Sequence, residues 1–166
     1  YGFGPENSKN IIDEDSILQI METVGFEKIS INNRELIKKN IKTKLDFNAI
    51  AKGYAVDVIS NYIESKGHLN YLIDIGGEIK SAGTNISKKD HWKIAINNPD
   101  LNNPNSFYKI LRLSNHSIAT SGNYRNYKID SLTGNKYVHI LNPITGKSQQ
   151  TNILSASVVS LSLIHI

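Results

Sequence analysis

The residues best suited to chemistry lie in residues 45–67, which read LDFNAIAKGYAVDVISNYIESKG. Asp46 and Lys52 flank the expected start of a helix. Asn48 is a candidate N-cap, because its side-chain oxygen can accept from an unpaired first-turn amide. A helix start carries about half a positive charge, and Lys52 adds a full one. These groups indicate a site for a phosphate or pyrophosphate, with an ordinary capped helix and a surface lysine as the competing interpretation.

His139 is the histidine whose position is most indicative of chemistry. It lies on an expected strand, residues 137–142, that runs into Pro143. An imidazole ordinarily titrates near neutral pH and can act as a general base. A hydrogen-bonded structural histidine is the alternative. The remaining histidines are isolated and lack the spacing of zinc ligands: His68, His91, His116 and His165.

Two further features interrupt expected apolar strands. Asp46 and Asp74 each place a carboxylate where burial would require a donor or a cation. Gly76 and Gly77 interrupt the strand pattern of residues 70–83. A glycine pair at such a place indicates a bulge, a contact between backbone and ligand, or a tight turn.

Two helices are expected to position these residues. The central one, residues 48–66, is amphipathic and is followed by Gly67 as a C-terminal cap. The second spans residues 13–24 near the N-terminus. The apolar face of the central helix comprises Ile50, Tyr54, Ala55, Val58, Ile59, Tyr62 and Ile63.

The rest of the sequence favours strands and turns. Residues 117–127 are rich in small and hydroxylated side chains and are expected to form a loop. The combination predicts an α+β domain with a largely antiparallel sheet, spanning residues 1–166. The expected strands are residues 26–32, 35–39, 42–47, 71–75, 78–82, 92–96, 108–113, 137–142 and 153–163.

Composition narrows the possible functions. The 166 residues contain no cysteine, which excludes disulfides and thiolate metal sites. The net charge of +4 comes from scattered lysines, so a nucleic-acid groove is disfavoured. No apolar run approaches the roughly 20 residues of a membrane span. Because the sequence begins with Tyr1 rather than Met, targeting is not readable from it.

Four blocks resemble the FAD:protein FMN transferase (ApbE) family in order and spacing, and the opening YGFGPE resembles the segment before that family's first helix. The blocks are LDFNAIAKGYAVD (45–57), YLIDIGGEIKSAG (71–83), IATSGNYRNY (118–127) and YVHILNPITGK (137–147). The resemblance implies transfer of the FMN half of FAD to a Ser or Thr hydroxyl of an acceptor flavoprotein. AMP is released, and the reaction uses Mg²⁺.

The resemblance also implies roles for individual residues. Asp46 and Lys52 match FAD contacts, and Leu141 matches a position lining the FAD site. Ala49 matches a metal-ligand position, which implies its backbone carbonyl. His139 matches a histidine that we assign as general base for the acceptor hydroxyl. Four further residues lie in blocks expected to border the flavin: Gly76, Gly77, Thr120 and Ser121.

The resemblance is incomplete at both ends. A later family segment with an Ala-Asp-Ala-like run and a Thr completes the metal site and is absent here, and residues 160–166 do not continue the family pattern. This implies an internal fragment whose apolar end leaves a core face uncovered. Hydrolysis of FAD to FMN and AMP and non-catalytic flavin binding remain alternatives. Family resemblance places the parent protein at the bacterial cell envelope, on the periplasmic side and with a possible lipid anchor; the oligomeric state is unknown.

Overall fold

The computed structural model divides the chain into two compact units. Unit 1 comprises residues 1–45 and 126–152, and unit 2 comprises residues 46–125 and 153–166. The sequence predicts a single domain over residues 1–166, and this stays a prediction. The expectations for residues 1–10 lie outside the described part of the chain, which is 13–100, 102–103, 105–124, 126–130, 133–148 and 151–166.

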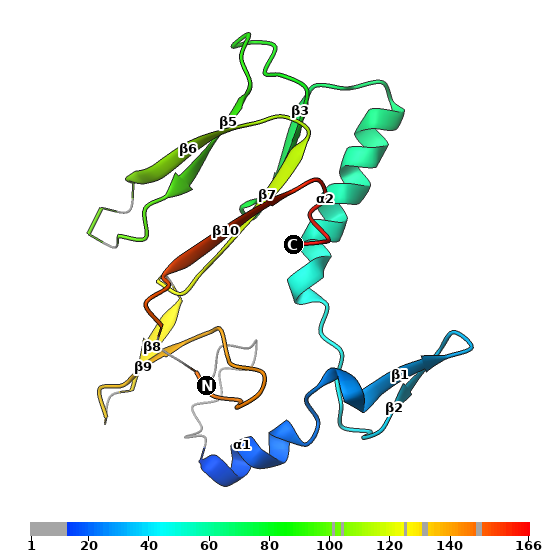
Figure 1. Ribbon diagram of the computed structural model, residues 1–166, viewed down its shortest axis with the longest axis vertical. Helices are drawn as coiled ribbons and strands as arrows, with labels where there is room; N and C mark the ends of the chain where they lie inside the picture. Colours follow the sequence, from blue (N-terminus) through cyan, green and yellow to red (C-terminus); the bar gives the residue numbers. More distant parts are fainter. Residues whose placement is uncertain (1–12, 101, 104, 125, 131–132, 149–150) are drawn as a thin grey trace. The chain divides into compact units, whose positions relative to one another are not determined.

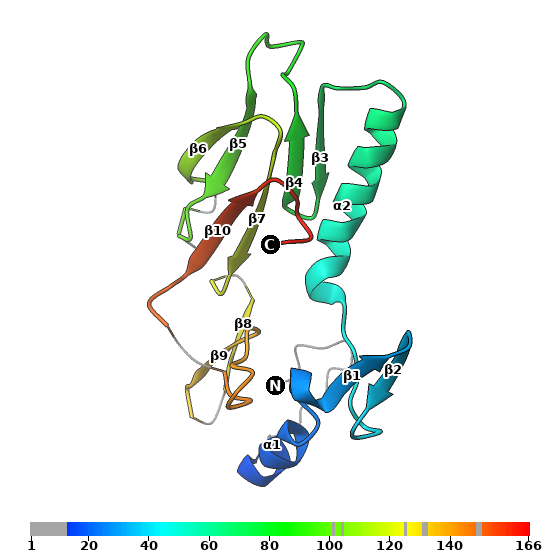
Figure 2. The ribbon, with the colours of Figure 1, turned by 45° about the vertical axis from the view of Figure 1, so that its right-hand side comes forward.

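Unit 2 is built on a four-stranded sheet in the order β10-β7-β4-β3, in which every neighbouring pair is antiparallel. Figure 2 shows these strands with α2 alongside β3 and β4. The α+β class and the largely antiparallel sheet are therefore confirmed. The strands are β3 (Tyr71–Ile75), β4 (Glu78–Ala82), β7 (His116–Gly122) and β10 (Ser155–Ser160).

The central helix α2 spans Asn48–Ser65, close to its expected bounds. Its C-terminus is closed by Gly67, which has φ +83°. The Gly67 amide donates to the Glu64 carbonyl and the His68 amide to the Ile63 carbonyl. This pair of bonds satisfies carbonyls that the helix end leaves without partners. The expected glycine cap is confirmed.

The side of α2 that packs on the sheet differs from the expected apolar face. Gly53, Val56 and Ser60 are buried. The stripe formed by Ile50, Tyr54, Val58 and Tyr62 is exposed. Apolar residues occupy both sides of the helix, so periodicity alone did not identify the packed one.

A second hairpin, β5 (Trp92–Asn97) and β6 (Phe107–Leu113), lies next to the sheet (Figure 1). Ile94 and Leu113 from this hairpin form a buried cluster with Ile118 of β7. A second cluster lies between α2 and the sheet and contains Val56, Tyr71, Ile73, Ala82 and Leu163. The two strands were expected at residues 92–96 and 108–113 and are confirmed.

Two expectations for unit 2 and its border are wrong. Residues 117–127 were expected to form a loop, but β7 crosses the middle of the sheet and pairs with both β4 and β10. Residues 42–47 were expected to form a strand, but they carry no strand in the described structure. Neighbouring strands stabilise β7 despite its small side chains, whereas residues 42–47 gain no such partner.

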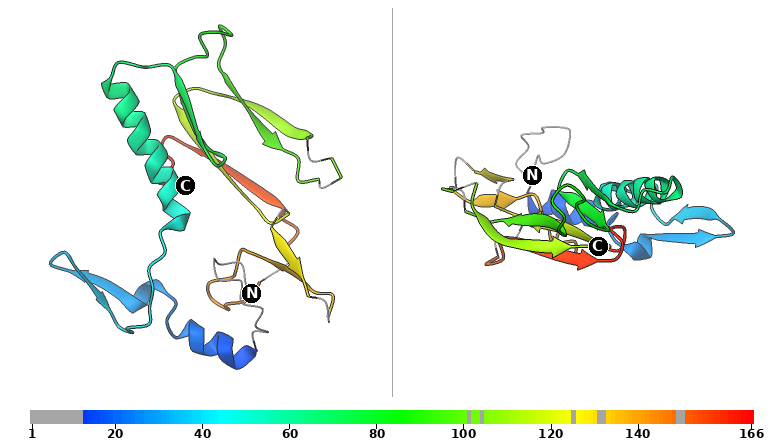
Figure 3. Two further views of the ribbon diagram at one scale, coloured as in Figure 1. Left: turned by 180° about the vertical axis from the view of Figure 1, so that it is seen from behind. Right: turned by 90° about the horizontal axis from the view of Figure 1, so that it is seen from above.

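The final segment packs against α2 rather than leaving its core face uncovered. Leu163 is 3% exposed and belongs to the cluster around Val56. A Cβ on Gly53 would lie 2.9 Å from the Leu163 carbonyl carbon, so glycine permits this close approach. Figure 3 shows the end of the chain lying against α2.

Unit 1 contains helix α1 (Glu14–Met21), where the Asp13 carboxylate caps the start by accepting from the Ser16 amide at 2.7 Å. Asn33 and Arg34 both have positive φ and form the turn of the hairpin that pairs residues 29–32 with residues 35–38. No helix in the described residues is long and apolar enough to cross a membrane. The remaining elements are η1 (Phe26–Lys28), β1 (Ile29–Asn32), β2 (Glu35–Lys38), β8 (Tyr127–Ile129) and β9 (Lys136–Val138).

Candidate functional site in unit 2

Asp46 fixes the entry of the chain into α2. Its Oδ1 accepts from the Asn48 amide at 2.8 Å. The N-cap residue is Phe47, whose side chain makes no capping hydrogen bond, and Asn48 is already the first helical residue. The expectation that Asn48 caps the helix is therefore wrong, because the carboxylate two residues earlier satisfies the first amide instead.

The first turn of α2 retains less anion-binding capacity than the sequence indicates. The amides of Ile50 and Ala51 both donate to the Phe47 carbonyl, at 3.0 and 2.8 Å. With the Asn48 amide bonded to Asp46, three of the first four helical amides have protein acceptors. An anion at this helix start would rely mainly on the charge of Lys52.

Lys52 reaches from α2 to the turn between β3 and β4. Its Nζ lies 3.7 Å from Glu78 Oε1, and a Cβ built on Gly76 would lie 3.4 Å from that Nζ. The Lys52 side chain is 53% exposed. An exposed pair of this kind contributes about 1 kcal/mol or less, so a phosphate oxygen can compete with Glu78 for the ammonium group.

The glycine pair forms a two-residue hairpin turn between Ile75 and Glu78 rather than a bulge, and contact between this backbone and a ligand stays a prediction. Gly76 and Gly77 have φ values of +63° and +91°, as a turn matched to strand twist requires. Asp74 Oδ1 accepts from the Gly77 amide at 2.8 Å and holds the turn closed. A Cβ on Gly77 would meet nothing within 4 Å, so this side of the turn is open to approach.

Thr120 and Ser121 lie near the end of β7, and both are exposed. Because Ile118 pairs antiparallel with Ile79 of β4, the register carries Thr120 toward the end of the sheet where Gly77 lies. The Thr120 hydroxyl is 2.7 Å from that of Ser157. The structure thus brings the glycine turn, the start of α2 and the two hydroxyls to one end of the sheet in unit 2.

Ala49 is exposed in the first turn of α2. Within the described part of the chain, no three His, Cys, Asp or Glu side chains gather as a metal site. Mg²⁺ requires about six oxygen ligands and usually takes carboxylates, waters and substrate phosphates. The described residues do not form such a donor set, and the Ala49 carbonyl as a ligand stays a prediction.

His139 and Leu141 belong to unit 1, and their approach to the α2 site stays a prediction. His139 directly follows β9, and its Nδ1 lies 3.2 Å from the Asn126 carbonyl oxygen. The expected strand over residues 137–142 is shorter than predicted, because β9 ends at Val138. Leu141 lies beyond the strand and forms an isolated bridge with Ser148.

Leu141 lines an apolar hollow of about 250 Å³ together with Ile17 and Met21 of α1. Gly146 closes the other side, where a Cβ would lie 2.9 Å from both Ile17 Cγ2 and Met21 Sδ. The sequence did not reveal this apolar hollow. Its walls come from segments more than a hundred residues apart, so no local pattern signals it.

Sequence reasoning also missed a polar centre formed by Asp57 of α2 and Lys80 of β4. Asp57 accepts from Lys80 Nζ at 3.2 Å, and both side chains are largely buried. Its other donors are the Ser162 hydroxyl at 2.8 Å, the Ile164 amide at 3.0 Å and the Leu163 amide at 3.4 Å. Burial raises the pKa of this carboxyl, but the hydrogen bonds from Ile164, Ser162 and Lys80 outweigh burial and lower the pKa below its ordinary value.

Comparison with known proteins gives the geometry a family context. The sequence model of the ApbE family matches residues 1–165, so the match includes the final segment that was expected to depart from the family pattern. The FAD:protein FMN transferase of Vibrio cholerae is 36% identical, covering 98% of this chain and 48% of that protein. The enzyme of the same name from Haemophilus influenzae is 32% identical, covering 96% and 47%.

Solved structures agree with these relatives. The flavin transferase ApbE from Vibrio cholerae superposes with a TM-score of 0.82 at 32% identity, covering 98% of this chain and 50% of that one. The flavinyl transferase ApbE of Pseudomonas stutzeri gives 0.82 at 32% identity, covering 99% and 49%. The chain spans about half the length of the curated relatives it matches. With its motif blocks on the same fold and the family match running through nearly every residue, the chain belongs to the ApbE family.

Proposed function

We propose that the protein containing this chain transfers the FMN half of FAD to a Ser or Thr hydroxyl of an acceptor flavoprotein and releases AMP. The observation that carries this proposal is the position of Lys52 over the Gly76–Gly77 turn, beside the start of α2. A cation above an open backbone turn suits a diphosphate. The names of the relatives supply the reaction class.

The proposed reaction is an in-line displacement at the FMN-side phosphorus. The acceptor hydroxyl oxygen forms the new P–O bond, and the bond to the AMP phosphate breaks. Lys52 binds the diphosphate and offsets its charge, and Asp46 orients the flavin half. Gly76, Gly77, Thr120 and Ser121 border the flavin nucleotide, and Leu141 offers it an apolar contact.

His139 takes the proton of the acceptor hydroxyl in this proposal. The contact between its Nδ1 and the Asn126 carbonyl favours the neutral tautomer with a proton on Nδ1. The basic lone pair is then on Nε2. A general base of this kind typically contributes a factor of about 10² to 10⁴ in rate.

Mg²⁺ is proposed as the ion that the reaction requires. The described residues supply no complete donor set. The remaining Mg²⁺ ligands are therefore proposed to come from substrate phosphates, water and the region of the full-length protein that corresponds to the half of its relatives outside this match. The Ala49 carbonyl is the proposed contribution of this chain. A Mg²⁺ ion supplies charge neutralisation at the diphosphate when bound.

The test is flavin transfer by the full-length protein. An acceptor protein incubated with FAD and Mg²⁺ should gain the mass of FMN, and AMP should appear in equal amount. His139→Ala should abolish the mass gain while FAD still binds. His68→Ala, which changes an exposed histidine after the end of α2, is the matched control and should transfer normally. Unchanged turnover in His139→Ala would remove the general-base role.

Two alternatives are separated by the same experiment. Free FMN and AMP without an acceptor mass gain indicate hydrolysis, in which water replaces the hydroxyl. Tight FAD binding without AMP, even with Mg²⁺, indicates a non-catalytic flavin-binding module; the half-length match to the relatives favours this outcome for the 166-residue chain alone. Location at the periplasmic face of the cell envelope is proposed for the parent protein, and fractionation of cells expressing it tests that location.

A further inference from the structure

A basic surface surrounds the loop between β4 and β5, at the opposite end of the β3–β4 hairpin from the Gly76–Gly77 turn. It carries five exposed basic side chains, here named the basic loop patch. A cavity of about 420 Å³ lies within it and is lined by Lys88, His91, Trp92 and Lys93, among others. The patch consists of Lys88, Lys89, His91, Lys93 and Arg112.

The loop that carries Lys88, Lys89 and His91 is held by its own hydrogen bonds. The Asn85 amide donates to the Asp90 carbonyl at 2.8 Å, and the Lys88 amide contacts both the backbone and side-chain oxygens of Asn85. At the wall of the cavity, Trp92 Nε1 donates to the Ala82 carbonyl at 2.8 Å. The cavity is therefore presented by a constrained backbone.

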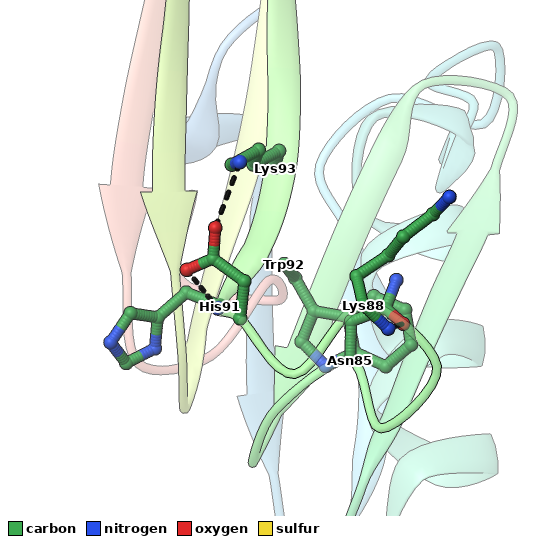
Figure 4. A pocket seen from close by; sticks show the side chains of 6 residues that line it. Asn85, Lys88, His91, Trp92 and Lys93 are labelled. Atoms are coloured by element: carbon green, nitrogen blue, oxygen red, sulfur yellow. Dashed lines mark hydrogen bonds and ion pairs between the residues drawn. The ribbon is translucent and has the colours of Figure 1, made fainter.

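The charge of the patch is mostly uncompensated. Asp90 is its acidic neighbour and is bound to Lys93 at 2.8 Å, as Figure 4 shows. Lys93 and Arg112 are register partners across β5 and β6, so their side chains lie on the same face. Within the described part of the chain, no ion pair involves Lys88, Lys89 or Arg112.

We propose that the basic loop patch docks an acidic segment of the acceptor protein. The inference rests on the proposed function, because a protein substrate needs a surface beyond the reacting site. Several cationic side chains around a cavity fit carboxylate side chains spaced along a peptide. The patch is too small for the extended basic track typical of nucleic-acid binding.

Direct binding tests the surface without any activity. Trp92 is the single tryptophan of the 166 residues, so the fluorescence of this chain reports occupancy of the cavity. A deca-glutamate peptide should change that fluorescence at low salt. Lys88→Glu should weaken binding at least about fivefold, the factor that about 1 kcal/mol gives, whereas Lys109→Glu on β6 should not. No binding, or equal fluorescence titrations with duplex DNA or inorganic phosphate, would overturn the proposal.

Kinetics of the full-length protein then assign the surface to the acceptor. Lys88→Glu and Arg112→Glu should each raise the KM for the acceptor about fivefold, with kcat and the KM for FAD unchanged. Normal acceptor KM values in both variants overturn this inference and leave the transferase proposal standing. Absence of flavin transfer by the unmodified protein overturns the transferase proposal and the acceptor assignment together.

Discussion

Asp46 illustrates how a single carboxylate can serve structure and binding together. One of its oxygens holds the Asn48 amide at 2.8 Å, and this bond replaces the missing side-chain cap at Phe47. Its proposed second role is contact with the flavin half of FAD. A substitution that removes the whole carboxylate therefore changes both the stability of the helix start and the binding of FAD.

Comparing Asp46→Asn with Asp46→Ala separates these roles. The amide oxygen of Asn can still accept from Asn48, so Asp46→Asn should retain stability, whereas Asp46→Ala should lose about 1 kcal/mol. Both variants should bind FAD more weakly than the original protein. Urea unfolding and FAD titration measure the two effects. Normal FAD affinity in both variants would remove Asp46 from the binding site.

The glycine turn makes a second prediction at the residue scale. Gly76 has φ +63°, which a residue with a Cβ adopts only at a cost of about 1 kcal/mol. Gly76→Ala should lower the unfolding free energy by about that amount. Gly76→Asn should cost less, because Asn tolerates the left-handed region. Equal stability of Gly76→Ala and the unmodified chain in urea would contradict the turn geometry.

At the scale of elements, α2 and β7 show which features local sequence can predict. The α2 bounds and its Gly67 cap follow from local signals, whereas the Gly76–Gly77 pair by itself left a bulge, a ligand contact and a turn open. The sequence of β7 is rich in Ser, Thr and Gly, and only pairing with two neighbours makes it a strand. Such pairing is non-local, and no periodicity in the segment itself reveals it.

The same limit applies to the candidate site. Lys52 lies six residues from Asp46, so their proximity at the helix start could be predicted. Its contact with the Gly76 turn and the approach of Thr120 to that end depend on how α2 and β7 meet the hairpin. The Asp57–Lys80 pair was missed because it joins a helix to a strand across 23 residues.

The Asp57–Lys80 pair predicts how the contact between α2 and β4 responds to acid. Hydrogen bonds to Asp57 place its pKa in the folded state below the ordinary aspartate value of 3.8. A lowered carboxyl pKa adds stability above pH 3.8, and this stability is lost as the pH falls through the folded-state value. Asp57→Asn should therefore lose less stability than the original chain between pH 5 and pH 2.5. Urea unfolding across this pH range measures the unfolding free energy of both proteins. Identical losses in the two proteins would contradict a lowered pKa of Asp57.

At the scale of the whole molecule, the proposed Mg²⁺ requirement predicts how the 166-residue chain, which spans about half the length of its relatives, binds Mg²⁺. The described residues form no three-ligand group, so the 166-residue chain should bind MgCl₂ only weakly in calorimetry. Addition of FAD should tighten that binding, because its diphosphate supplies hard oxygen ligands. EDTA should stop flavin transfer by the full-length protein, and excess Mg²⁺ should restore it. Tight Mg²⁺ binding by the chain without FAD would show that it contains a complete ligand set.

The interleaving of the two units has a consequence for biosynthesis. Each unit draws on two separated stretches, so the polypeptide passes between them at residues 45–46, 125–126 and 152–153. A ribosome must reach residue 152 before unit 1 has all its parts, and β10 of unit 2 emerges later still. Neither unit has all of its residues until part of the other unit has been synthesised. A protease nick at any single crossing would leave both joined through the remaining two.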